Sequence, residues 1–391
     1  MTEMAILDIQ RRRLLHYGFV GLGAFFGSTL LPTSAMSTVL SLGTLGKLLS
    51  ADKNGIRLPA GFTSRVIAHS GQMLFGYKWH AAPDGGATFA TTDGGWIYVS
   101  NSELKNKTGG VGAVRFNAQG QLIDAYSILN HTDRNCAGGP TPWETWLSCE
   151  ETDTGQVWEC DPTGNKAACV RPALGTFRHE AVAVDHQNKQ LYLTEDEPDG
   201  CLYRYTASTF TAAGHPSLND GILEVADVVN GTTGLVRWLR VPDPQATTKA
   251  TRRQVTGATH FDGGEGIWYH QGVIYFSTKG DNRVWAYHTR DHNLSILYNA
   301  AAYQQPVLTG VDNITGNAAG ELLVAEDKGN MQIVAVTADK VVPVLQVVGH
   351  NGSEITGPAL SPDGSRLYFS SQRGKTGLVE DGVTFEITGP F

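Results

Sequence analysis

The sequence predicts an all-β protein, a six-bladed β-propeller, and three observations support this fold class. Glycine is abundant, with 46 among 391 residues. Long stretches alternate β-branched or aromatic residues with polar ones, as half-buried strands do. A short apolar strand pattern, with a turn residue before it and polar groups after it, recurs six times along the chain.

The recurrence has the period of a propeller blade. The equivalent first apolar residues of the six patterns are Trp96, Trp146, Leu191, Val273, Leu322 and Leu367. Their spacings are 50, 45, 82, 49 and 45 residues, and one four-stranded blade occupies about 40–50 residues. The long spacing predicts an insertion around residues 207–256, which read as loop-like and polar. A β-sandwich array, the competing architecture, does not explain the regular recurrence.

Closure of the ring is expected to pair an early strand with a late one. Residues 62–68 and 383–388 both have strand patterns, and their pairing would cover the edges that an open ring exposes. Turn sequences such as Ser-Pro-Asp-Gly at 361–364 separate the apolar runs, as a β-meander requires. Residues 36–391 are therefore predicted to form a single domain.

The first 35 residues have the pattern of an export signal. Three arginines at 11–13 precede two leucines, a glycine-rich apolar run at 17–31 and small residues up to Ala35. This order is typical of a signal peptide, and the paired arginines favour the twin-arginine route. A general secretory leader and an uncleaved amphipathic anchor are the alternatives. We therefore expect a periplasmic or extracellular protein, without a stable membrane span after processing, because the apolar run is short.

The charge of the chain excludes one class of ligand, and its cysteine count leaves at least one thiol unpaired within the chain. The net charge is −8 and lysines and arginines form no later runs, so a nucleic-acid ligand is not expected.

Five cysteines cannot all pair within the chain. Cys160 and Cys169 flank a turn sequence and could bridge two neighbouring strands. Cys136 lies in a polar, glycine-rich turn and is the candidate unpaired thiol, although a buried, inert thiol is the usual state of a free cysteine.

The functional signal lies directly after the repeated strands. Acids follow five of the six patterns: Glu103, Glu150-Glu151, Glu195-Asp196-Glu197, Asp281 and Glu326-Asp327. In a propeller these strand ends converge on one mouth of the central channel. Acids that converge without counter-ions repel one another, and bound cations remove this repulsion. A single acid at a strand end is usually a solvated turn residue, but turn propensity does not explain the repeated glutamates. The sequence therefore predicts a central metal-binding channel.

Two further glutamates precede other strands. Glu180 lies in Thr-Phe-Arg-His-Glu-Ala and Glu265 in His-Phe-Asp-Gly-Gly-Glu-Gly-Ile, at expected blade entries. His179 and His260 are weaker candidates, because a lone histidine is more often a hydrogen-bonded structural residue. Oxygen ligands alone select calcium, magnesium or manganese, whereas a Cys136 thiolate among them indicates a softer, redox-capable or zinc-like ion.

These residues resemble the PhoX-type alkaline phosphatases. The matching stretches are Asn-Cys-Ala-Gly-Gly-Pro-Thr-Pro-Trp at 135–143, Glu-Glu at 150–151, Phe-Arg-His-Glu at 177–180, Tyr-Leu-Thr-Glu-Asp at 192–196 and Phe-Asp-Gly-Gly-Glu-Gly at 261–266. The resemblance covers most of the chain after the leader. It implies a monomeric six-bladed propeller that hydrolyses small phosphate monoesters with a central cluster of iron, as Fe³⁺, and Ca²⁺.

The resemblance also implies roles for individual residues. Cys136 would be an iron ligand, and Glu195, Asp196, Glu326 and Asp327 would bind calcium. The complete set of metal-ligand candidates is Cys136, Glu150, Glu151, Glu180, Glu195, Asp196, Glu265, Glu326 and Asp327.

The chain departs from the family pattern at one position of chemical importance. Gly263-Gly264 stands where family members have Arg-Pro, and that arginine is expected to hold a phosphate oxygen. The candidates to replace it as catalytic cations are Arg178, Lys279 and Arg373.

Two other functions are compatible with a propeller. A calcium-dependent lactonase or esterase would use Asn101, Asn282, Asn313 and Glu265 as ligands, but such a site has no use for a thiolate. An exported, non-enzymatic binding propeller would hold only structural calcium.

Overall fold

The computed structural model describes residues 41–229 and 231–391, and the export signal expected at 1–35 lies outside the described residues. Residues Val39–Phe391 form one compact unit. Within the described ranges the regular structure is antiparallel sheet, and every helix is a short 3₁₀ turn. No helix in these ranges has the length and apolar character needed to cross a membrane.

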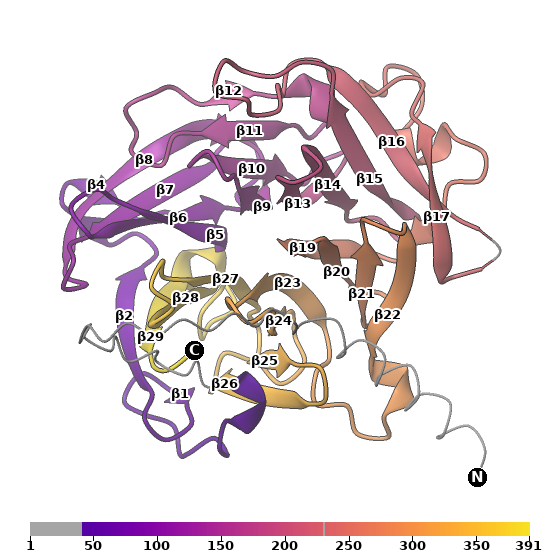
Figure 1. Ribbon diagram of the computed structural model, residues 1–391. Coiled ribbons are helices and arrows are strands. Elements are labelled where there is room, and N and C mark those ends of the chain that lie inside the picture. The colour runs from indigo at the N-terminus through magenta and orange to yellow at the C-terminus, as the bar shows by residue number, and fades with distance from the viewer. Residues whose placement is uncertain (1–40, 230) are drawn as a thin grey trace, which may run out of the picture. The chain divides into compact units, whose positions relative to one another are not determined.

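The strands form six antiparallel meanders arranged around a central axis (Figure 1), which confirms the predicted propeller. Blade 1 comprises β5 (Pro83–Ala90), β6 (Trp96–Ser102), β7 (Gly109–Phe116) and β8 (Leu122–Thr132). Blade 2 comprises β9 (Asn135–Pro140), β10 (Trp146–Glu150), β11 (Val157–Cys160) and β12 (Cys169–Val170). Blade 3 comprises β13 (His179–Asp185), β14 (Gln190–Glu195), β15 (Gly200–Ala207) and β16 (Gly221–Val228). Blade 4 comprises β19 (Gly264–His270), β20 (Val273–Thr278), β21 (Arg283–His288) and β22 (Asn293–Asn299). Blade 5 comprises β23 (Val311–Gly316), β24 (Leu322–Glu326), β25 (Gln332–Val336) and β26 (Val341–Val347). Blade 6 comprises β27 (Ile355–Leu360), β28 (Arg366–Ser371), β29 (Val383–Thr388) and β2 (Thr63–His69).

Shorter elements decorate the blades. These are η1 (Leu42–Thr44), β1 (Ile56–Arg57), β3 (Met73–Leu74), β4 (Tyr77–Lys78), η2 (Pro172–Leu174), β17 (Gly234–Arg240), η3 (Thr251–Arg253), β18 (His260–Phe261), η4 (Ala300–Ala302) and η5 (Val379–Asp381). Strand β1 extends blade 5 by pairing with β26, and β18 pairs with β15.

The segment 207–256 is not loop-like throughout, which corrects the expected insertion. It contains β16, the outer strand of blade 3, in which Leu223 and Val225 are buried. The next strand, β17, pairs with both β16 and β22 and thereby joins the outer edges of blades 3 and 4. Residues 221–228 form a strand because they pair with β15, and the local composition does not show such a long-range partner.

The ring closes as the sequence predicts. Strand β2 pairs with β29 over a register from Thr63↔Thr388 to His69↔Val383, so blade 6 takes one strand from the early part of the chain. The innermost strands β5, β9, β13, β19, β23 and β27 each pack against the next, and β27 packs against β5. No blade is therefore left with an exposed innermost edge.

Close approach of the innermost strands requires glycine at the axis. A Cβ atom on Gly139 of β9 would lie 1.8 Å from the carbonyl oxygen of Val182 in β13, and one on Gly138 would lie 1.9 Å from that of Leu147. Around this axis, apolar side chains of adjacent blades form buried clusters. All five cysteines are free thiols, so Cys160 and Cys169 do not form the bridge that the sequence allowed.

Candidate metal centre

One mouth of the central channel is a cavity of about 130 Å³ lined by two rings of side chains. The first ring is the second residue of the innermost strand in blades 1 to 5, namely Asp84, Cys136, Glu180, Glu265 and Asp312. The second ring is the residue directly after the second strand of the same blades, namely Glu103, Glu151, Asp196, Lys279 and Asp327. Glu354 and Arg373, which flank β27 and β28, complete the lining.

A β-bulge places each member of the first ring. In blades 1 to 5 the register of the innermost strand shifts at this residue, for example between Pro83 and Gly86 in β5 and between His179 and Val182 in β13. A bulge leaves an extra residue unpaired and redirects its side chain. The side chains of this ring are thereby turned toward the channel mouth.

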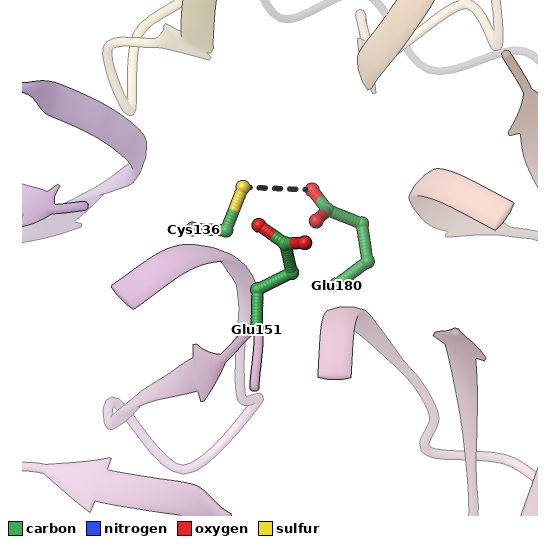
Figure 2. Close-up of side chains that lie close together, drawn as sticks. All are labelled: Cys136, Glu151 and Glu180. Atoms are coloured by element: carbon green, nitrogen blue, oxygen red, sulfur yellow. Dashed lines mark hydrogen bonds between the residues drawn. The ribbon is translucent and has the colours of Figure 1, made fainter. Parts of the chain in front are cut away.

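Three groups in the cavity have the composition and spacing of metal sites. They are Cys136–Glu151–Glu180, Glu180–Glu265–Asp312 and Asp84–Glu103–Glu354, and in each group one potential ligand atom per residue lies within 4.8 Å of the others. Figure 2 shows the first group, in which the thiol and both carboxylates point toward one another. The Cys136 Sγ to Glu180 Oε1 distance is 3.4 Å.

Burial and mutual repulsion shift the ionisation of these groups. Burial, followed by the charges of Glu265 and Asp312, raises the pKa of Glu180 well above its ordinary value. Burial, followed by Asp196, raises the pKa of Glu265 to about 8. Burial also raises the pKa of the Cys136 thiol. A bound cation lowers the pKa of the groups that ligate it and therefore favours their ionised forms.

The donor set fits metal ions. The Oδ1 atom of Asp327 is buried and has no hydrogen-bond partner among the described residues. Carboxylate oxygens suit hard cations such as Ca²⁺, and the single thiol adds one ligand for a softer transition metal.

Each of the three groups contains one carboxylate that is paired with a basic side chain. Arg178 binds Glu151. The Nζ atom of Lys279 lies 2.5 Å from Glu265 Oε1, 3.6 Å from Asp196 Oδ2 and 3.9 Å from Asp327 Oδ2. Arg373 lies with Nη2 2.5 Å from Oε1 of Glu354.

These three cations do not occupy equivalent places. Lys279 and Arg373 line the cavity, whereas Arg178 does not line it and pairs with Glu151, which does. Burial lowers the pKa of Lys279, but the charges of Glu265, Asp312 and Asp196 outweigh this effect, so that the pKa is raised and the ammonium stays charged.

Six of the nine predicted metal ligands line the cavity, namely Cys136, Glu151, Glu180, Asp196, Glu265 and Asp327. The structure does not bring Glu150, Glu195 and Glu326 there, which corrects the expectation for these three residues. Each of them precedes a member of the second ring and closes the second strand of its blade. Neighbouring side chains of an extended chain point to opposite sides, so only the second acid of each pair faces the channel.

The three displaced glutamates have structural hydrogen bonds instead. Glu150 accepts from the backbone N–H groups of Asp133 and Gln156. Glu195 accepts from the Tyr203 hydroxyl at 2.7 Å and pairs with Arg252. The backbone donors to Glu326 are Thr309, Asn330 and Gln332.

Asp84, Asp312 and Glu354 line the cavity but were not identified from the sequence. The first two carried a recognisable signal, because each is followed by a small or polar residue and precedes the repeated strand of its blade by 12 and 10 residues. Glu265 and Glu180 stand 8 and 11 residues before theirs. In blade 6 the equivalent of the second ring is Gln372, whose amide donates to Asp84 and Glu103.

The weaker candidates lie elsewhere. His179 is buried with Nε2 3.1 Å from the carbonyl oxygen of Gly175, and His260 is exposed with Nδ1 2.7 Å from that of Asp199. Asp281 accepts from the Thr278 hydroxyl. Neither the two histidines nor Asp281 belongs to the cavity lining.

The asparagines of the lactonase interpretation have structural partners. The Oδ1 atom of Asn101 accepts from Trp146 and Ser148. That of Asn282 accepts from the backbone N–H of Gly310, and that of Asn313 from Gly357 at 2.7 Å.

Comparisons with known proteins agree with the fold and the motifs. Residues 77–295 match the model of a protein family described as Alkaline phosphatase PhoX. A comparison with curated proteins finds no match. Among solved structures, Pseudomonas fluorescens PhoX in complex with vanadate, a transition state analogue, has a TM-score of 0.73 and 17% identity, over 88% of this chain and 98% of that one. A Bacteroides thetaiotaomicron protein of unknown function has a TM-score of 0.51 and 9% identity, over 84% and 76% of the two chains.

Proposed function

Since the family model covers more than half of its residues, the chain belongs to the PhoX alkaline phosphatase family, and we propose that it hydrolyses phosphate monoesters with bound metal ions. The observation that carries the proposal is the Cys136–Glu151–Glu180 group, which lies in the same cavity as two basic side chains. A structural calcium site has no need of a thiol or of nearby cations that can bind a phosphate.

We infer a division of the ligands by chemistry. Cys136, Glu151 and Glu180 would hold iron as Fe³⁺, because this group alone supplies a sulfur ligand. The all-carboxylate group Asp84–Glu103–Glu354 would hold Ca²⁺. Ions bound in these groups would polarise the phosphoryl group and reduce the charge that develops in the transition state.

The chain's own cations would hold the phosphoryl oxygens. Lys279 and Arg373 line the cavity, where ion pairs with Glu265 and Glu354 hold the two side chains in place. Donors placed in advance around a developing negative charge stabilise it without reorganisation. Gly263 has a φ of 68°, and a Cβ atom there would lie 3.2 Å from Asp196 Oδ1 and 3.7 Å from the Cβ of Lys279. Lys279 therefore lies beside the position of the missing arginine and is the best placed of the three cations to substitute for it.

The alternative functions have less support. The amide oxygens of Asn101, Asn282 and Asn313 accept hydrogen bonds from the protein, so a calcium site of the lactonase type would have to break those bonds. A binding protein with structural calcium leaves the Cys136 group unexplained.

We propose further that the mature protein acts as a monomer outside the cytoplasm, after export by the twin-arginine route. Passengers of that route cross the membrane folded. Coordination of Cys136 before export would protect the thiol from oxidation.

The test is elemental analysis of the mature protein beside its Cys136→Ala variant. We expect iron and calcium in the wild type, and loss of iron in the variant together with a fall of about 100-fold or more in hydrolysis of p-nitrophenyl phosphate. Cys169→Ala is the matched control, because this thiol is exposed and does not line the cavity. Calcium alone, unchanged by Cys136→Ala, would show that Cys136 is a structural thiol.

A further inference from the structure

Two arginines flank a single carboxylate of the cavity lining. Arg178 binds Oε1 of Glu151, and Nη1 of Arg134 lies 4.0 Å from Oε2 of the same residue. Both guanidinium side chains are partly accessible, with 28% of each exposed. Neither arginine belongs to the cavity lining, whereas Glu151 does.

These two side chains have unused hydrogen-bond donors. A guanidinium offers five N–H groups. The Arg134 side chain makes no hydrogen bond to another residue in the described part of the chain, and its contact with Glu151 is only a loose ion pair. The Nε–H of Arg178 is buried without a partner among the described residues. The N–H donors of the two guanidinium groups thus exceed what Glu151 alone can accept.

A neighbouring acid does not remove this excess. Glu197 lies 4.0 Å from Nη1 of Arg178, but it also lies 3.3 Å from Nη2 of Arg252. Its carboxylate is therefore shared with a third guanidinium.

The backbone holds Arg134 at this place. Its N–H donates to the carbonyl oxygen of Leu104 at 2.8 Å, and its own carbonyl accepts from the N–H of Glu151 at 2.9 Å. The residue has a φ of 47°, in the left-handed region that non-glycine residues seldom adopt. Such conformations have an energetic cost and concentrate at functional sites.

We propose that Arg134 and Arg178 form a second anion-binding site, which selects phosphate monoesters whose alcohol part carries another anionic group. Lys279 and Arg373 lie in the cavity, where the phosphoryl group to be transferred would be held. Arg134 and Arg178 contact Glu151, which lines the same cavity, and their partly exposed side chains would meet the alcohol part of the ester. A forked guanidinium binds a carboxylate or a phosphate through paired, charge-assisted hydrogen bonds. That the bound anion is a substrate rests on the proposed function, but binding of an anion at this site does not depend on turnover.

The test uses phosphonates, because their P–C bond is not hydrolysed and equilibrium binding can be measured whether or not the enzyme is active. The dissociation constants of 3-phosphonopropionate and propylphosphonate, which differ by one carboxylate, are measured by calorimetry on the full mature protein. We expect the carboxylated compound to bind about tenfold tighter. The preference should fall toward one in Arg134→Gln and partly recover in Arg134→Lys, which keeps the charge but loses the fork. Propane-1,3-diphosphonate tests whether a second phosphate is preferred to a carboxylate.

Arg115→Gln is the matched control, since this partly exposed arginine pairs with Asp93 on blade 1 and does not line the cavity. It should keep the wild-type preference. Equal affinity for the two phosphonates in the wild type, a preference that survives Arg134→Gln in a protein with wild-type circular dichroism, or binding of neither compound would each overturn the proposal. Hydrolysis of 3-phosphoglycerate and glycerol 3-phosphate is measured separately. Absence of hydrolysis with the phosphonate preference intact would refute the proposed function and leave the anion site standing.

Discussion

Glu150 and Glu151 are adjacent in the chain, yet their carboxylates lie in different environments. Glu151 faces the cavity, where burial raises its pKa and Arg178 partly offsets that effect. Glu150 accepts hydrogen bonds from the backbone N–H groups of Asp133 and Gln156 and holds two loops together. The same division separates Glu195 from Asp196 and Glu326 from Asp327. At the residue scale, the second acid of each pair is the candidate ligand.

Substitution of the two neighbours separates the roles. We expect Glu151→Gln to lower the metal content and the phosphatase activity together, because an amide is a weaker ligand than a carboxylate. Glu150→Gln should keep the metal and cost about 1–3 kcal/mol of unfolding free energy, because hydrogen bonds to a charged acceptor are replaced by weaker ones. Elemental analysis and urea unfolding measure the two effects. Loss of metal in Glu150→Gln with Glu151→Gln unaffected would reverse the assignment.

At the element scale, blades 1 to 5 each supply two side chains of the cavity lining by the same device. The bulge in the innermost strand turns one side chain toward the channel, and the end of the second strand brings another beside it. The ring that results is closed by pairing of β2 with β29. The site therefore depends on closure by strands that lie far from it in the sequence.

Truncation of a core residue in the closing strand should test this dependence. Phe385 in β29 is 2% exposed and stacks on Phe369 at 5.3 Å between ring centroids. We expect Phe385→Ala to lower the free energy of unfolding by about 3–5 kcal/mol, measured by urea unfolding with an unchanged dependence on denaturant. Val170→Ala, in a partly exposed position of β12, should cost less than about 0.5 kcal/mol. Equal effects of the two substitutions would mean that closure contributes little to stability.

At the scale of the whole molecule, the fold concentrates negative charge on one axis. Nine carboxylates and one thiol line a cavity of about 130 Å³ together with Lys279 and Arg373. Burial, followed by the charge of Asp327, raises the pKa of Glu354 to about 8, as burial and Asp196 do for Glu265. Binding of metal ions to these carboxylates would therefore be coupled to folding.

This coupling predicts how the chelated protein responds to pH. Above the ordinary pKa of a glutamate and below about 8, folded Glu265 and Glu354 retain protons that the unfolded chain has released. The folded state then binds more protons, so the free energy of unfolding decreases as the pH rises. We expect the Tm of the chelated protein to fall between about pH 7 and pH 8.5, a window above the ordinary histidine pKa of about 6.5.

Calorimetry after chelation, with and without added Ca²⁺ and iron, measures this effect. Added metal should restore the Tm most at the upper end of the window, because it favours the ionised carboxylates. The Glu265→Gln/Glu354→Gln double variant should show a weaker pH dependence in the chelated state. A Tm that rises across the window would contradict the coupling.

Sequence periodicity predicted most of the fold, including the six blades and the closing pair of strands. It also brought the acids after these strands to one mouth of the channel, Glu151, Asp196 and Asp327 among them, because equivalent positions of a repeat occupy equivalent places in space. It was wrong for Asp281, which does not line the cavity. It failed for β16, whose state depends on pairing with β15, and for Asp84, Asp312 and Glu354, which lie before or within the less regular innermost strands.

The amino-acid sequence by itself determined the class of fold, the family motifs and the chemistry of the ligands, since periodicity and residue type are local properties. The tertiary structure decided which acid of each pair faces the channel, which cations line the cavity, and that Arg134 shares Glu151 with Arg178. Those outcomes depend on the bulges and on packing between blades, where a shift of one residue moves a side chain to the opposite face. No local pattern records that choice.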